Sequence, residues 1–152
     1  MQLSAAGLEL LKRSEGFRSR MYLDVAGVPT IGYGHRIVAP ESFPNGIPES
    51  QAAQMLAQDV REAEQAVLRL VKVSLTQGQF DALVDFCFNL GCGRLACSTL
   101  LKVLNAGRYQ DAVEQLLHWD MAGGRENAAL KVRRQAEADL WRCGGTRQEA
   151  AA

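Results

Sequence analysis

The chain has 152 residues, of which 47% are hydrophobic and 22% are charged, and its 17 basic side chains balance 17 acidic ones. This length and composition predict a single soluble globular unit with enough residues for a sizeable core. The balanced charge excludes the broad basic field that drives nucleic-acid binding, so we expect no nucleic-acid partner.

The first predicted element is a helix that ends at Glu15. Ser4 is a candidate N-cap, and apolar residues follow it at helical spacing. Residues 20–37 then change pattern, because aromatic and β-branched residues are broken by glycine and proline, which is typical of a small hairpin-rich sheet. We therefore expect Asp24 and Thr30 on neighbouring strands, facing one cavity mouth.

The rest of the chain is predicted to be helical. Residues 49–71 are predicted to form a long amphipathic helix. The next helix begins with a capping box at Thr76 and ends at Gly91. A short helix follows Ser98, another begins at Tyr109, and the last runs over 127–142. We expect one catalytic domain over 1–143 and a frayed tail over 144–152.

The two carboxylates, Glu15 and Asp24, suit acid/base cleavage of a sugar link. Such a bond breaks through an oxocarbenium-like transition state, which needs one protonated carboxyl as acid and one ionised carboxylate as base or nucleophile. Glu15 would need partial desolvation to keep its proton, whereas Asp24 would stay wetter and ionised. The alternative for two isolated acids is a solvated surface residue and a turn residue.

The segment SEGFRSRMYLDVAGVPTIGYGH resembles the catalytic motif of the phage-type lysozymes, the muramidase endolysins. Eight residues separate Glu15 from Asp24, five separate Asp24 from Thr30, and a Gly-x-Gly-His turn follows. The resemblance continues through SLTQGQFDALVDFCFNLG, STLLKVLNAGRY, WDMAGG and ALKVRRQAEADL, which covers about residues 3–143. The chain departs from the family pattern at Ala129-Leu130 and at Ile47-Pro48, away from the three motif residues.

The resemblance implies an α+β, lysozyme-like fold, with a small N-terminal lobe that carries the hairpin sheet, a larger helical C-terminal lobe, and a cleft between them. It also implies that Glu15 is the general acid, that Asp24 is the base or nucleophile, and that Thr30 holds the catalytic water or positions Asp24. Tyr33, Gly34 and Arg36 are candidate sugar-binding residues, because a flat ring and a close glycine backbone suit a polysaccharide.

Several residues have two interpretations. His35 is expected to be structural rather than catalytic. Arg133 and Arg134 could face the cleft and hold Glu15 or carboxylates of the wall peptide. Alternatively, they could pair with Glu137, and we favour this structural role. Trp119 and Trp141 are expected in the core.

The cysteines and histidines do not predict a metal site. Cys87, Cys92, Cys97 and Cys143 lack metal-ligand spacing, so we expect no metal and no cofactor. Thiols are favoured for a chain made in the cytosol, although a Cys92–Cys97 or Cys97–Cys143 disulfide stays open.

The expected function is hydrolysis of the β-1,4 link between N-acetylmuramic acid and N-acetylglucosamine in peptidoglycan, by a monomer that lyses the host cell. The alternatives are a lytic transglycosylase and a non-catalytic wall-binding domain of the same fold. The first residues show neither a secretory signal nor a membrane span. We therefore expect synthesis in the host cytoplasm and action in the periplasm after the membrane is permeabilised, as a holin does for relatives.

Overall fold

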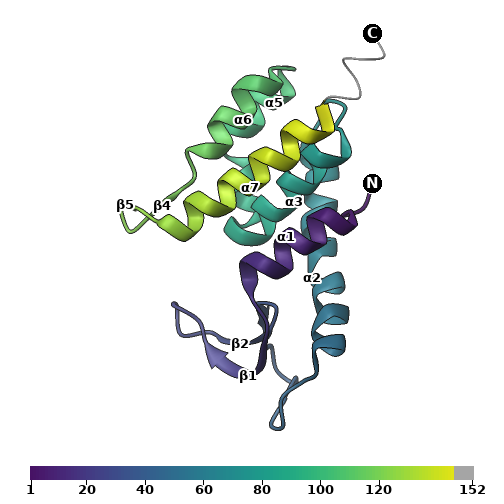
Figure 1. Ribbon diagram of the computed structural model, residues 1–152, viewed down its shortest axis with the longest axis vertical. Coiled ribbons are helices and arrows are strands. Elements are labelled where there is room, and N and C mark those ends of the chain that lie inside the picture. Colours follow the sequence, from purple (N-terminus) through teal and green to yellow (C-terminus); the bar gives the residue numbers. More distant parts are fainter. Residues whose placement is uncertain (146–152) are drawn as a thin grey trace. The chain divides into compact units, whose positions relative to one another are not determined.

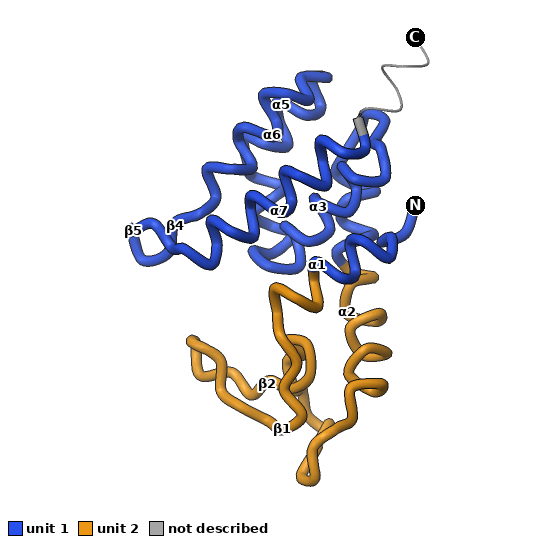
Figure 2. The backbone as a smooth tube through the Cα atoms, viewed as in Figure 1, with its two compact units in different colours: residues 1–10, 63–152 blue, residues 11–62 orange. Residues whose placement is uncertain are grey.

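The computed structural model describes residues 1–145 and combines helices with two small antiparallel sheets (Figure 1). The chain divides into two compact units (Figure 2), of which one is Leu11–Glu62 and the other comprises Met1–Leu10 and Ala63–Ala152. The chain passes from one unit to the other within two helices, α1 (Ala5–Glu15) and α2 (Glu49–Leu70). The predicted α+β class is confirmed.

The unit over residues 11–62 carries the three-stranded sheet. Its strands are β1 (Arg18–Leu23), β2 (Pro29–Gly32) and β3 (His35–Arg36), in the order β1-β2-β3 with antiparallel pairing. Tyr22 pairs with Thr30 across β1 and β2, and the register shifts between Arg18 and Tyr22. This arrangement confirms the hairpin-rich sheet predicted from the alternating and glycine-broken pattern.

The same unit packs β2 closely against α2. Gly32 has a φ of +67°, and a Cβ there would lie 3.1 Å from the Cβ of Ala52 and 3.3 Å from Cδ1 of Ile47. Ile31 of β2 and Leu56 of α2 are also buried. Only glycine fits both the left-handed backbone and the close approach, so Gly32 fixes the end of β2 against the helix.

The other unit is mainly helical. Its remaining elements are α3 (Gln77–Leu90), α4 (Cys92–Ala96), α5 (Thr99–Asn105), α6 (Tyr109–Leu117), β4 (Met121–Ala122), β5 (Arg125–Glu126) and α7 (Ala128–Gly145). Figure 1 shows β4 and β5 as a small hairpin between α6 and α7. Buried apolar side chains from these helices form its core, including Phe80, Leu83, Phe86, Leu95, Leu100, Leu104, Leu116 and Trp141.

The predicted helix caps are present. The Thr76 hydroxyl accepts a hydrogen bond from the Gln79 N–H while the Gln79 side chain accepts one from the Thr76 N–H, which completes the capping box of α3. Ser98 caps α5 through the Leu101 N–H. The Ser4 hydroxyl accepts from the Gly7 N–H at 3.2 Å, and the Ser4 N–H donates to Oδ1 of Asp81 at 3.0 Å, so the start of α1 is joined to α3.

Helices α3 and α7 approach so closely that two glycines are required between them. A Cβ on Gly78 would lie 2.0 Å from the carbonyl oxygen of Leu140, and one on Gly144 would lie 2.5 Å from Oγ1 of Thr76. Real Cβ atoms do not make such contacts, so the helix backbones meet directly at this point.

The structure differs from the prediction in three short segments. The helix α4 and the β4–β5 hairpin were not predicted, because no apolar periodicity marks the five residues of α4 and no β-branched or aromatic run marks the two-residue strands β4 and β5. The helix α7 continues to Gly145 instead of ending at residue 142, so the first two residues of the predicted tail are helical. The rest of that tail, 146–152, lies outside the described residues. Within the described part of the chain, no helix is long and apolar enough to cross a membrane.

Candidate active site

Glu15 is the last residue of α1, as predicted, and its side chain is half-buried. The helix stops there because Gly16, with a φ of +70°, turns the chain away while its N–H donates to the Lys12 carbonyl at 2.9 Å. The Glu15 carboxyl lies against the backbone of Gly34, where a Cβ would come within 2.9 Å of Oε2. The turn after β2 therefore fixes one side of this carboxyl.

Asp24 directly follows β1 and organises the turn to β2. Its Oδ1 atom accepts hydrogen bonds from the N–H groups of Ala26 and Val28, both at 2.9 Å. The Asp24 N–H also donates to the Val28 carbonyl at 3.0 Å, which closes the hairpin. This is the side-chain mimicry of a backbone turn that aspartate favours. The carboxylate is therefore held in one orientation by its own turn, with both side-chain bonds on the same oxygen.

Thr30 lies in β2 and is 3% exposed. Its hydroxyl donates to the Val28 carbonyl at 2.8 Å. The Val28 carbonyl therefore accepts a hydrogen bond from the Thr30 hydroxyl, and the Val28 N–H donates one to Oδ1 of Asp24. One peptide residue joins the two predicted catalytic side chains, which fits the expectation that Thr30 positions Asp24.

Tyr22 also belongs to this group, although sequence reasoning did not select it. It pairs with Thr30 across the sheet, and Asp24 follows two residues later, just beyond the end of β1. Burial and then the negative charge of Glu15 raise the pKa of the Tyr22 hydroxyl, Arg18 opposes them, and Asp24 adds a smaller increase. The two-residue spacing from Asp24 was the available signal in the sequence.

The predicted sugar-binding residues have different environments. Tyr33 is 8% exposed, its hydroxyl donates to Oε1 of Glu49 at 2.8 Å, and its ring lies 5.6 Å from that of Phe17. These contacts give Tyr33 a packing role in its unit. Gly34 is the turn residue beside Glu15, and Arg36 is exposed on β3. A contact of these three residues with sugar stays a prediction.

His35 is held between two carboxylates. Its Nδ1 lies 2.7 Å from Oδ2 of Asp59, and its Nε2 lies 2.7 Å from Oε2 of Glu41. Burial lowers the pKa of His35, but the hydrogen bonds and charges of Asp59 and Glu41 outweigh it, so the pKa is raised above its ordinary value of 6.5. The imidazole thus joins β3, the following loop and α2, in agreement with the structural role expected for it.

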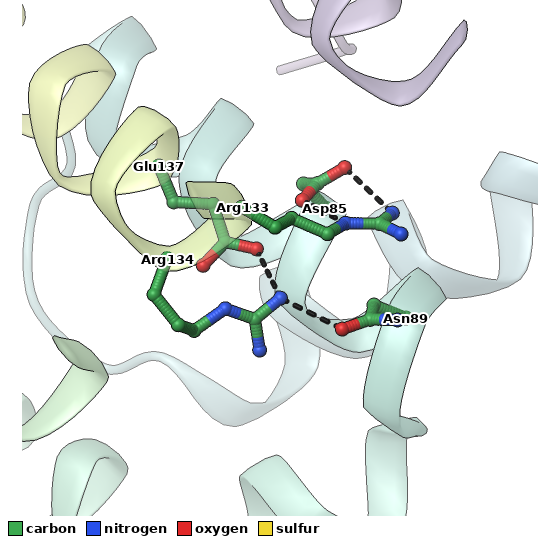
Figure 3. Close-up of polar contacts among 5 residues, drawn as sticks. All are labelled: Asp85, Asn89, Arg133, Arg134 and Glu137. Carbon is green, nitrogen blue, oxygen red and sulfur yellow. Dashed lines mark hydrogen bonds and ion pairs between the residues drawn. The ribbon is translucent and has the colours of Figure 1, made fainter. Parts of the chain in front are cut away.

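Arg133 and Arg134 take part in a buried polar cluster in the other unit (Figure 3). Arg133 donates to both carboxylate oxygens of Asp85, at 2.9 and 3.0 Å, and Arg134 donates to Glu137 at 2.7 Å and to Asn89 at 2.8 Å. The expected pairing of these arginines with Glu137 is confirmed for Arg134.

The pKa values of the two acids in this cluster shift in opposite directions. Burial and the neighbouring Asp85 raise the pKa of Glu137 well above its usual range. Burial acts in the same direction on Asp85, but hydrogen bonds to Glu137 and Arg133 outweigh it and lower that pKa.

The cysteines form no disulfide within residues 1–145. Cys87 is buried, as expected from its place on the apolar face of α3, and burial raises the pKa of its thiol further above the ordinary value. In the described part of the chain, no three His, Cys, Asp or Glu side chains are grouped as metal ligands.

Comparison with known proteins gives the same family that the sequence motif resembles. Residues 12–137 match the family model for phage lysozyme. The chain is 40% identical over 141 residues to the endolysin of Salmonella phage P22, which covers 91% of this chain and 97% of that protein. It is 42% identical over 147 residues to the endolysin of Bacillus phage B103, covering 95% of this chain but only 55% of that longer protein.

Solved structures give the same result. An endolysin from Escherichia coli O157:H7 phage FAHEc1 superimposes with a TM-score of 0.84 at 38% identity, and the match covers 93% of each chain. The muramidase domain of SpmX from Asticaccaulis excentricus also gives a TM-score of 0.84, at 36% identity, covering 92% of this chain and 97% of that domain. The chain belongs to the phage lysozyme family.

Proposed function

We propose that this chain is a muramidase endolysin, which hydrolyses the β-1,4 bond between N-acetylmuramic acid and N-acetylglucosamine in bacterial peptidoglycan. One arrangement carries the proposal: Glu15 is half-buried at the end of a helix, and Asp24 in the same unit is fixed by its own turn. Val28 connects Asp24 to Thr30 by hydrogen bonds. Family membership and the muramidase neighbour support the choice of substrate.

In this proposal Glu15 is the general acid. It would give its proton to the glycosidic oxygen as the bond to the leaving sugar breaks. Its half-buried position and the Gly34 backbone against its carboxyl support this role, because the acid must be held in one place to meet that oxygen.

Asp24 would act as the ionised partner, either by directing a water molecule to the anomeric carbon or by attacking that carbon itself. Two N–H groups converge on its Oδ1 atom and hold the carboxylate in one orientation. Thr30 would help to fix the same turn, because its hydroxyl donates a hydrogen bond to the Val28 carbonyl.

A lytic transglycosylase is the second candidate, because it needs only the acid and lets a hydroxyl of the muramyl sugar attack. The hydrogen-bonded turn that holds the Asp24 carboxylate favours hydrolysis, since a transglycosylase does not require a second carboxylate. Mass analysis of digested peptidoglycan separates the two: hydrolysis predicts muropeptides that end in a reducing sugar, and anhydro-muropeptides as the main product would overturn the proposal.

We also propose that the protein acts on the wall as a monomer, reaching the periplasm from the host cytoplasm after a holin has opened the inner membrane. The relatives named as endolysins support an action on the host wall. Expression in Gram-negative cells with and without a co-expressed holin tests the route, since abrupt lysis without the holin would contradict it.

A further inference from the structure

The loop over residues 38–46 joins β3 to α2 and is fixed at both ends. The N–H groups of Ile37 and Ile47, which flank the loop, donate to backbone carbonyls of β2 and β1 at 2.9 and 2.8 Å. The first five residues of the loop are all exposed. Among the hydrogen bonds of residues 1–145, one joins these five residues to another element, and it is the contact of Glu41 with His35. The exposed half of the loop therefore depends on a single contact.

That contact requires a doubly protonated imidazole. A neutral imidazole has one N–H and one lone pair, and a carboxylate only accepts hydrogen bonds. Both ring nitrogens of His35 lie 2.7 Å from a carboxylate oxygen, Nδ1 from Asp59 and Nε2 from Glu41. A lone pair facing a carboxylate oxygen at this distance would be repelled, whereas an imidazolium donates to both sides. The two distances thus indicate the charged ring, and the raised pKa of His35 agrees with it.

These two carboxylates are the charged groups that act on the ring from the elements around it. Asp59 belongs to α2 and Glu41 to the loop, while Ile31, which pairs with His35 across β2, is apolar. Loss of one proton therefore changes the balance between two partners only.

The two partners differ in how easily they can separate from the ring. Asp59 lies within the 22-residue helix α2, and its side chain is 28% exposed. Glu41 is 36% exposed and lies in the loop, whose backbone can move without breaking a helix. When one N–H remains on the ring, Asp59 keeps it through Nδ1. The lone pair on Nε2 then faces Glu41, and the loop moves away.

We propose that His35 and Glu41 form a pH-sensitive latch, which holds the loop over residues 38–46 while the imidazole carries both protons and releases it when the ring loses one. Because the charged ring is the form present at lower pH, the loop is held on the acid side of the transition and is released as pH rises above about 6.5. The proposal does not depend on the proposed function, since neither residue is assigned a part in that reaction.

NMR of the ¹⁵N-labelled full chain tests the latch, with pH raised from about 5.5 until the His35 ring loses a proton. The ring-nitrogen shifts should show that Nε2 is the atom that loses it. Backbone order parameters of residues 38–42 should fall at the same midpoint, from about 0.85 to below about 0.6. Loss of the proton from Nδ1 instead, or order parameters that stay constant through the transition, would overturn the proposal.

Glu41→Gln separates the latch from a general effect of pH. The glutamine oxygen can accept from the charged ring, and its amide can donate to Nε2 of the neutral ring, so the loop should stay ordered on both sides of the transition. Glu62→Gln is the matched control, because it removes the same charge from an exposed position on α2 in the same unit. It should keep the pH-dependent release of the unmodified protein. Release that persists unchanged in Glu41→Gln, or that is lost in Glu62→Gln as well, would contradict the latch.

Discussion

At the scale of single residues, Asp24 has two tasks that a substitution can separate. One is the charge proposed for catalysis, and the other is the pair of hydrogen bonds by which Oδ1 holds Ala26 and Val28. The sequence suggested an acid that directs water, but the turn contacts appear only when the hairpin is seen. Asparagine keeps an acceptor oxygen at the same place and loses the charge.

We therefore expect Asp24→Asn to keep the unfolding temperature near that of the unmodified protein while hydrolysis falls sharply. Asp24→Ala should lose both activity and stability, by about 1–3 kcal/mol, because two N–H groups lose their acceptor. Thermal unfolding and sugar-end release, measured on both variants, check this. Equal stability of the two variants would show that the turn does not depend on the side chain.

His35 makes stability depend on pH. Its pKa is raised in the folded state, so its contribution to the free energy of unfolding is fully present below the unfolded value of about 6.5 and fades as pH rises through the folded pKa. We expect the difference in unfolding temperature between the unmodified protein and His35→Gln to be large near pH 5.5 and to shrink on the alkaline side.

The control for this series is His118→Gln, since His118 is exposed at the end of α6. Its unfolding temperature should follow that of the unmodified protein across the same range. A His35→Gln difference that stays constant with pH would mean that the contacts with Asp59 and Glu41 do not involve a charged imidazole.

At the scale of elements, the contact between α3 and α7 gives a prediction opposite to the usual rule. Replacing glycine by alanine inside a helix normally stabilises it by about 0.5–1 kcal/mol. At Gly78 the added Cβ would meet the Leu140 carbonyl at 2.0 Å, so we expect a loss of roughly 1–3 kcal/mol as the helices separate.

Gly93 provides the matched case. It lies in α4, and nothing approaches within 4 Å of the position that its Cβ would take. Gly93→Ala should therefore be neutral or stabilising. Denaturant unfolding of both variants measures the difference, and a stabilised Gly78→Ala would contradict the close contact between the two helices.

The elements also show which structure can be predicted from a sequence. The caps at Ser4, Thr76 and Ser98 were predictable because their hydrogen bonds reach only three residues along the chain. The place of Tyr22 was not, because it depends on the strand register and on the shift between Arg18 and Tyr22. Long-range pairs such as Arg133 with Asp85 could not be predicted either, since the two residues are 48 positions apart in the sequence.

At the scale of the whole molecule, the residues proposed for catalysis all lie in the unit over residues 11–62, whereas the other unit contains a large helical core. The spacing of Glu15, Asp24 and Thr30 predicts the family from the sequence, and the comparisons confirm that family. The physical reason for that spacing is the hairpin itself, because its turn fixes Asp24 while Val28 connects Asp24 to Thr30.

Glu15 is proposed to give its proton to the glycosidic oxygen as the sugar bond breaks. Glu15→Gln keeps the size and hydrogen-bonding reach of the side chain but cannot give up a proton. Glu9→Gln makes the same change at an exposed position of the same helix and serves as the control.

The most direct measurement is the rate at which each purified variant releases reducing sugar ends from purified peptidoglycan. We predict that Glu15→Gln is slower than the unmodified protein by roughly a hundredfold or more, with the unfolding temperature unchanged and Glu9→Gln fully active. A Glu15→Gln rate within a few-fold of the unmodified protein would contradict the account.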